Sequence, residues 1–204
     1  MANANKPMGL SPHSYLGGAR WSGQGTWYAI LSSDSNAYAI GDPVALASSG
    51  DTLGIPGVTL ATAGTGNTLI GAIVGISNAA PSTYGGALSG SSTQFGAVII
   101  PATKTANYYV LVCDDPSVLF EVQEGGTGTA LATTDVGNNI NLKSGTNNGY
   151  VSGWVIDNNS KGTGNTIQCQ LMRLIQRADN TFGASAKWLV RINNHQFSGG
   201  TTGV

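Results

Sequence analysis

The sequence predicts an all-β protein, an antiparallel β-sandwich or jelly roll with long loops and an extended N-terminal arm. Short segments of alternating or β-branched apolar residues are separated by Gly, Asn and Ser clusters, which is the pattern of many short antiparallel strands. The chain has 30 glycines among its 204 residues, and glycine disfavours helices. Because no internal repeat and no linker stands out, we expect one domain over residues 21–204, preceded by an arm over residues 1–20.

In the first half we expect strands at residues 27–31, 38–46, 58–60, 69–76, 97–101 and 108–113. Residues 69–76 are apolar throughout, as in a strand buried on both faces. Residues 77–94 are small, polar and rich in glycine, and we expect a long loop there. The run from Tyr108 to Cys113 is the strongest core candidate, because it is continuous and rich in β-branched and aromatic residues.

In the second half we expect strands at residues 118–123, 140–143, 150–156, 166–176 and 187–193. The sequence Asp114-Asp115-Pro116 predicts a turn, since Asp bonds its own backbone and Pro fixes φ. Asn148-Gly149 predicts a hairpin, because both residues accept positive φ. In the last strand Trp188, Val190 and Ile192 share one face. The only helical signal is one short turn over residues 133–136.

Composition restricts the possible partners. Charged residues make up 9% of the chain, against about 25% in ordinary soluble domains, and a neutral polar exterior suits permanent packing. The net charge of −1 does not favour nucleic acid. The first 14 residues lack the apolar stretch of a signal peptide, and no apolar run approaches the length of a membrane span. We therefore expect synthesis in a cytoplasm, no secretion leader and no membrane contact.

The charges are unevenly distributed along the chain. Five cations follow residue 160 (Lys161, Arg173, Arg177, Lys187 and Arg191), against the single acid Asp179. Two interpretations stay open: a chance segregation of solvated charges, or a basic face that docks on an acidic partner.

The sequence offers little for catalysis, and we expect no enzyme, cofactor or metal site. His13 and His195 are isolated and are expected to be exposed or hydrogen-bonded rather than catalytic. Asp114, Asp115, Glu121 and Glu124 are the only clustered acids. They are interpreted as turn residues, although a cation site or a glycosidase built on Asp115 and Glu121 stays an alternative.

The cysteines and tryptophans are assigned mainly to the interior. Cys113 and Cys169 lie in apolar runs and are expected to be small buried hydrophobes, with their pairing left open. Trp154 and Trp188 are expected in the core. Trp21, beside Arg20 in a polar loop, is an interface anchor, a sugar-stacking platform together with Tyr84, or a locally packed side chain.

We expect partner contacts from the N-terminal arm, its flanking loop and the basic last strand. The candidate interface residues are Lys6, Met8, Leu10, Tyr15, Arg20, Trp21, Lys187, Arg191 and His195. If the arm serves only the partner, removal of residues 1–14 leaves the fold intact.

Several segments resemble virion structural proteins of tailed bacteriophages. They are Met1-Ala2-Asn3 with the Pro7–Leu10 stretch, residues 38–44, residues 61–67, Asp115-Pro116 leading into residues 120–123, and residues 186–195. Together they are most similar to capsid cement, or head decoration, proteins, and the similarity runs over nearly the whole chain.

This resemblance implies a β-sandwich or jelly roll on the outside of a phage head. Such a protein would bridge neighbouring major capsid protein subunits as a homo-oligomer, a dimer or trimer at local symmetry axes. The resemblance transfers no functional residue. The alternative, from another class, is a carbohydrate-binding module of a phage tail or fibre.

Overall fold

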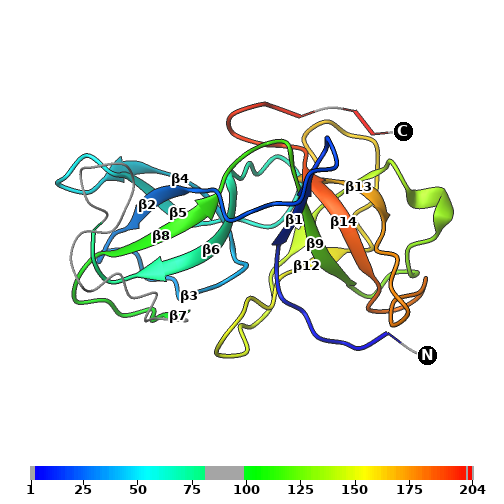
Figure 1. The fold of residues 1–204 in the computed structure, drawn as a ribbon, viewed down its shortest axis with the longest axis horizontal. Coiled ribbons are helices and arrows are strands. Elements are labelled where there is room, and N and C mark those ends of the chain that lie inside the picture. Colours follow the sequence, from blue (N-terminus) through cyan, green and yellow to red (C-terminus); the bar gives the residue numbers. More distant parts are fainter. Residues whose placement is uncertain (1–2, 81–98, 201, 204) are drawn as a thin grey trace.

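The computed structural model describes residues 3–80, 99–200 and 202–203, and these residues form an all-β fold, as predicted. Figure 1 shows two lobes side by side. The left lobe is a closed barrel with the strand order β2-β5-β4-β6-β8. The right lobe contains a seven-stranded sheet with the order β10-β13-β14-β9-β12-β11, in which β1 also pairs with β9. The several sheets are consistent with the sandwich and jelly-roll class, and the structure adds that one of them closes on itself.

The barrel is formed by five strands from the first part of the chain. Its strands are β2 (Thr26–Ile30), β4 (Pro43–Gly50), β5 (Pro56–Leu60), β6 (Gly71–Ser77) and β8 (Tyr108–Cys113). Only the pair β2 and β5 is parallel; the other neighbours are antiparallel. Beside the barrel, β3 (Tyr38–Ala39) pairs with β7 (Ile99–Ile100). The predicted strand at residues 108–113 is confirmed to the residue, and Val110 and Val112 of its apolar run are fully buried in the barrel core.

The second lobe is built around β9. Its elements are β9 (Val118–Gly125), β10 (Asn139–Ile140), β11 (Leu142–Lys143), β12 (Val155–Asp157), β13 (Cys169–Leu174) and β14 (Lys187–Ile192). Strand β9 pairs with β14 on one side. On its other side it pairs with β1 near its start and with β12, in parallel, at its end. The predicted short turn is the 3-10 helix η1 (Thr133–Asp135).

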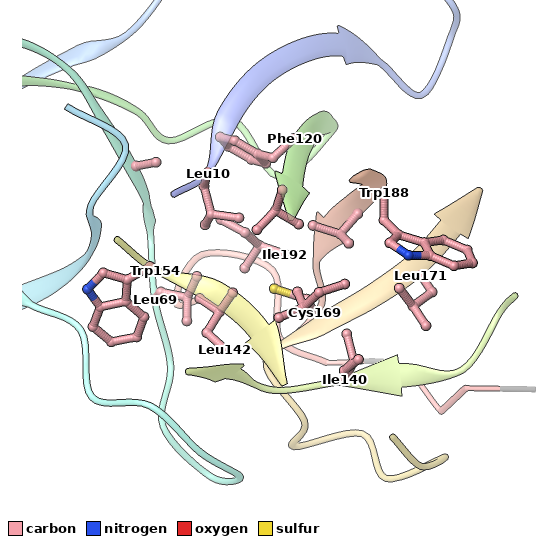
Figure 2. Close-up of a cluster of buried hydrophobic side chains, with 14 of the residues drawn as sticks. Leu10, Leu69, Phe120, Ile140, Leu142, Trp154, Cys169, Leu171, Trp188 and Ile192 are labelled. Carbon is pink, nitrogen blue, oxygen red and sulfur yellow. The ribbon is translucent and has the colours of Figure 1, made fainter. Parts of the chain in front are cut away.

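The core of the second lobe confirms the predicted inward face of the last strand. Trp188, Val190 and Ile192 are all buried in it, together with Trp154. Both cysteines are buried and are free thiols, as small hydrophobic residues would be. Figure 2 shows that Leu69, which precedes barrel strand β6, also lies in this cluster. The two lobes therefore share part of one core.

The N-terminal residues belong to the second lobe rather than extending away from it. Residues 11–15 form β1 (Ser11–Tyr15), which pairs with β9. Leu10 is fully buried and contributes to the core in Figure 2. Asn3 donates from Nδ2 to the backbone oxygens of Thr181 (2.8 Å) and Ala184 (3.0 Å). Removal of residues 1–14 would therefore take away most of β1 and a core side chain, so the expectation of an intact fold after truncation is not supported.

One predicted turn lies between β8 and β9, and the other was expected between β11 and β12. Asp115 accepts the Ser117 N–H at its Oδ1 (2.7 Å) and the Val118 N–H at its carbonyl oxygen (3.1 Å), which confirms the turn. Gly149 has a φ of 90°, but Asn148 does not have a positive φ, and residues 144–154 separate the antiparallel strands β11 and β12, so the predicted tight two-residue hairpin does not form. Residues 81–94 of the expected long loop and residues 97–98 of the strand expected at residues 97–101 lie outside the described residues.

Candidate interaction surface

The sheet of the second lobe has an outward face that its central strands build by simple alternation. On β9 and β14, Phe120 and Val190 point into the core and are almost fully buried. Their neighbours point the other way, since successive side chains of a strand alternate between faces. Glu121, Leu189 and Arg191 thus share the outward face.

Two β-bulges bring further side chains to this face. Strict alternation from Cys169 would turn Arg173 into the core, but the register shifts between Leu171 and Arg173, and Arg173 instead lies opposite Leu189. A similar shift between Pro12 and Ser14 leaves His13 as the extra residue of β1. Bulges redirect side chains in this way at functional sites as well as at sheet edges. Neither bulge has a signal in the sequence, so His13 was not among the predicted interface residues, and Arg173 was predicted only as one cation of a possible basic face.

The outward face contains two adjoining hollows. The first has a volume of about 360 Å³ and the second of about 310 Å³. The first is lined by His13, Ser14, Tyr15, Leu16, Gly18, Arg20, Leu119, Met172 and Arg173. The second is lined by His13, Glu121, Arg173, Ile175, Gln176, Arg177 and Leu189. His13 and Arg173 line both, so they form the wall between the two hollows.

The floor of the hollows is apolar. Leu119, Ile175 and Leu189 form a small cluster separate from the main core, and Met172 packs against it. Leu189 is only 1% exposed, so the cluster lies beneath longer polar side chains. Arginine and lysine commonly cover apolar surface with their aliphatic stems in this way. A partner would therefore meet charged rims before it met the aliphatic floor.

The rim is predominantly positive. Arg177 is neutralised, because its Nη1 lies 3.0 Å from Glu121 Oε1 and its Nε lies 3.3 Å from Asp179 Oδ1. Arg191 donates from Nε to Gln170 Oε1 (2.9 Å). Arg20 and Arg173 are exposed, and their side chains form no hydrogen bond or ion pair within the part of the chain that is described.

Four of the predicted interface residues lie on or beside this face. Tyr15 and Arg20 line the first hollow, and the Tyr15 hydroxyl donates to Gln24 Oε1 (3.1 Å). Arg191 lies on the outward side of β14. Lys187 lies on the same side of β14 but is 9% exposed, with Nζ 3.5 Å from the Ala4 carbonyl oxygen.

The other predicted interface residues are elsewhere. Met8 and Trp21 line an apolar crevice of about 250 Å³ together with Ile40 and Ile73 of the barrel lobe. The Trp21 indole N–H donates to the Gln24 carbonyl oxygen (3.0 Å). The Lys6 side chain is exposed, while its backbone N–H donates to Gln123 Oε1 (2.7 Å). Leu10 is in the core, as described above.

His195 is an interior residue. It is 1% exposed, and its backbone forms a parallel bridge with Leu69 at the junction of the lobes. Its Nδ1 accepts the N–H of Phe197 (3.0 Å), so the ring proton of the neutral form lies on Nε2. Burial lowers the pKa of His195 below its usual value. The expectation of a hydrogen-bonded histidine is met, but the side chain is not available to a partner in this conformation.

The clustered acids have structural partners. Asp114 Oδ2 accepts the Tyr28 hydroxyl (2.8 Å), and burial together with this bond raises the pKa of Tyr28. Glu124 is buried and accepts the Trp188 indole N–H (2.9 Å), and burial raises the pKa of this carboxyl above its usual value. Among the described residues, no group of three or more His, Cys, Asp or Glu side chains is placed to hold a metal ion.

Comparison of the chain with protein-family models, with curated proteins and with solved structures finds no match. In the described ranges, no helix has both the length and the apolar character needed to cross a membrane. Tyr84, the second residue expected in a sugar-stacking platform, lies outside the described residues.

Proposed function

We propose that this chain is a virion structural protein, a capsid cement or decoration protein that binds the outside of a phage head and stabilises contacts between major capsid protein subunits. The proposal begins from the sequence resemblance. The observation that carries it is the outward face of β1, β9, β13 and β14, where cationic rims surround two adjoining hollows with apolar floors.

The hollows suit the side chains of a protein partner better than a single small ligand. Their volumes of about 360 and 310 Å³ lie at the low end of ligand pockets, which span about 300–1,000 Å³. They share the wall formed by His13 and Arg173, so one extended segment of a partner can fill both. Each contact of this kind contributes a modest binding free energy. Repetition of the contact over a lattice raises the overall affinity through avidity.

The scarcity of charge supports a stationary role. With 9% charged residues, the exterior gives less protection against self-association than an ordinary soluble surface does. A protein that is held permanently against neighbours does not need that protection. Self-association as a dimer or trimer belongs to the same proposal and would repeat the face around a symmetry axis.

The test is a fractionation of intact virions into heads and tails, followed by quantification of this chain against the shell protein. We expect it in the head fraction at a fixed ratio. The matched biochemical test mixes purified chain with expanded, undecorated heads and measures sedimentation with them. Absence of the chain from heads in both measurements would contradict the proposal.

The carbohydrate-binding alternative depends on Trp21. Its indole lines a crevice whose other side chains, including Met8, Ile40 and Ile73, are mostly apolar, whereas sugar sites need converging polar groups to fix the hydroxyls. Saccharide titration followed by tryptophan fluorescence separates the two functions. Saturable quenching that is lost in Trp21→Ala would favour the sugar-binding module.

A further inference from the structure

Among the described residues, every acidic side chain has a hydrogen-bond or ion-pair partner within the chain, whereas some basic side chains have none. All ten Asp and Glu side chains accept a hydrogen bond or an ion pair from the chain itself. Asp34, for example, accepts the Tyr38 hydroxyl (2.8 Å), and Asp135 pairs with Lys161 (2.9 Å). Each carboxylate therefore has at least one partner within the fold.

The cations are not all occupied. The side chains of Lys6, Arg20, Lys143 and Arg173 form no hydrogen bond or ion pair within the described residues, which include all nine Lys and Arg. Lys6 and Lys143 are separate surface residues that line neither hollow. Arg20 and Arg173 line the same hollow, although they are 153 positions apart in the sequence. The fold thus brings together two arginines for which it supplies no anion.

The surroundings of the two arginines fit one kind of ligand group. His13 lies in the wall of the hollow, and its Nδ1 is 3.1 Å from Ser14 Oγ. Leu119 and Met172 form an apolar floor beneath the cations. Guanidinium groups bind carboxylates through two parallel hydrogen bonds, and the interaction strengthens beside a low-dielectric surface.

We propose that this hollow binds a carboxylate side chain in an acidic, partly apolar segment of the protein partner, with the carboxylate held between Arg20 and Arg173. A neighbouring aliphatic side chain of the same segment packs on Leu119 and Met172. This inference rests on the proposed function and names the chemistry by which its partner is recognised.

The charge distribution selects this occupant over two others. A second copy of the chain is the weaker candidate, because each of its ten Asp and Glu side chains already accepts at least one hydrogen bond or ion pair within its own fold. Nucleic acid is disfavoured because the net charge of the chain is −1, and phosphate backbones are bound by extended basic surfaces. The remaining candidate is a different protein with exposed Asp or Glu. Apolar side chains next to that carboxylate would pack on the apolar floor of the hollow.

The experiment uses the full chain, labelled for NMR, and two capped peptides, Leu-Glu-Leu-Asp-Leu and its neutral counterpart Leu-Gln-Leu-Asn-Leu. We expect the acidic peptide to shift the signals of Arg20, Arg173 and the Met172 methyl, with weaker binding as salt rises. The double variant Arg20→Gln/Arg173→Gln should bind it at least about tenfold more weakly, the equivalent of one charge-assisted bond. Lys143→Gln is the matched control, since it removes a free cation outside the hollow, and it should bind as the parent does.

Several results would overturn the inference. Equal binding of the two peptides would mean that carboxylates are not recognised, and unchanged binding by the double variant would mean that these arginines are not the site. Competition by inorganic phosphate at the peptide's own affinity would assign the hollow to phosphate. The head-sedimentation assay distinguishes the two proposals. If the chain binds the acidic peptide but does not sediment with heads, only the cement function is contradicted. Head binding that survives the double variant, with no peptide binding, removes the carboxylate site only.

Discussion

At the residue scale, buried polar side chains hold loops in place by bonding backbone groups that are not paired within a β-sheet. Gln168 is fully buried; its Oε1 accepts the N–H groups of Gly64 (3.0 Å) and Leu142 (3.1 Å), and its Nε2 donates to the Thr62 carbonyl oxygen (2.8 Å). Buried amides and charges are tolerated when every hydrogen-bonding atom has a partner. None of this was foreseeable from the sequence, because a glutamine near the start of the strand expected at residues 166–176 gives no sign of which backbone groups it will meet.

His195 provides a pH prediction at this scale. Its folded pKa is lowered by burial, so the unfolded chain binds more protons than the folded chain as the pH falls below the usual value near 6.5. The free energy of unfolding should therefore decrease as the pH falls from about 7 to 5. In His195→Gln the slope of stability against pH over this interval should be smaller.

The measurement is urea denaturation at a series of pH values. His13→Gln is the control, because His13 is exposed on β1, and it should keep the slope of the parent protein. A slope that is equally steep in His195→Gln and in the parent would mean that other groups set the acid sensitivity.

At the element scale, the sequence predicted strands that bury a continuous apolar run and failed where pairing depends on distant partners. Residues 108–113 needed no partner to be recognised, because their apolar character is sufficient. Strand β1 has the sequence Ser-Pro-His-Ser-Tyr and no apolar alternation; it exists because β9 pairs with it. Proline is compatible with such a position at the edge of a sheet. The bulges of β1 and β13 were missed for the same reason, so the hollow they build was not predicted.

The docking of β1 depends on a close backbone crossing, and this makes a second prediction. Gly41 has a φ of 90°, and an added Cβ would overlap the Met8 carbonyl oxygen; the Leu10 N–H donates to the Gly41 carbonyl oxygen (2.9 Å) at the same crossing. Gly41→Ala should therefore combine backbone strain with displacement of the N-terminal segment. We expect a loss of about 3 kcal/mol in the free energy of unfolding and faster amide exchange in β1.

Gly23→Ala is the control for strain alone. Gly23 also has a positive φ, of 96°, but an added Cβ there would meet no other atom within 4 Å. It should cost about 1 kcal/mol and leave β1 exchange unchanged. Equal losses for the two variants would show that the crossing adds nothing to the stability of the fold.

At the scale of the whole molecule, the two lobes in Figure 1 are joined by more than a chain crossover. Leu69 packs into the core of the second lobe, and its N–H and carbonyl oxygen bond Asn194 (3.2 Å) and Gln196 (3.0 Å). The sequence predicted one domain over residues 21–204, and that boundary stays a prediction. What the sequence did not reveal is the presence of two large core clusters, one in each lobe, because alternation identifies buried faces without saying which faces meet.

Shared packing of this kind predicts that the lobes unfold together. Lys104 tests this, because its fully buried Nζ donates to the carbonyl oxygens of Asp34 (2.6 Å) and Asn36 (2.7 Å) within the barrel lobe. Lys104→Met removes the donor to these two carbonyl oxygens and the ion pair with Asp34 Oδ1 (3.5 Å), at a cost of about 3 kcal/mol. Hydrogen exchange under urea should then show β8 of the barrel and β14 of the second lobe losing protection at the same, lowered denaturant concentration. Lys143→Met, which removes an exposed cation with no partner within the described residues, should leave both midpoints in place. If Lys104→Met instead lowers the midpoint of β8 and leaves that of β14 unchanged, the lobes are independent folding units, and the segment around Leu69 contributes contact without cooperativity.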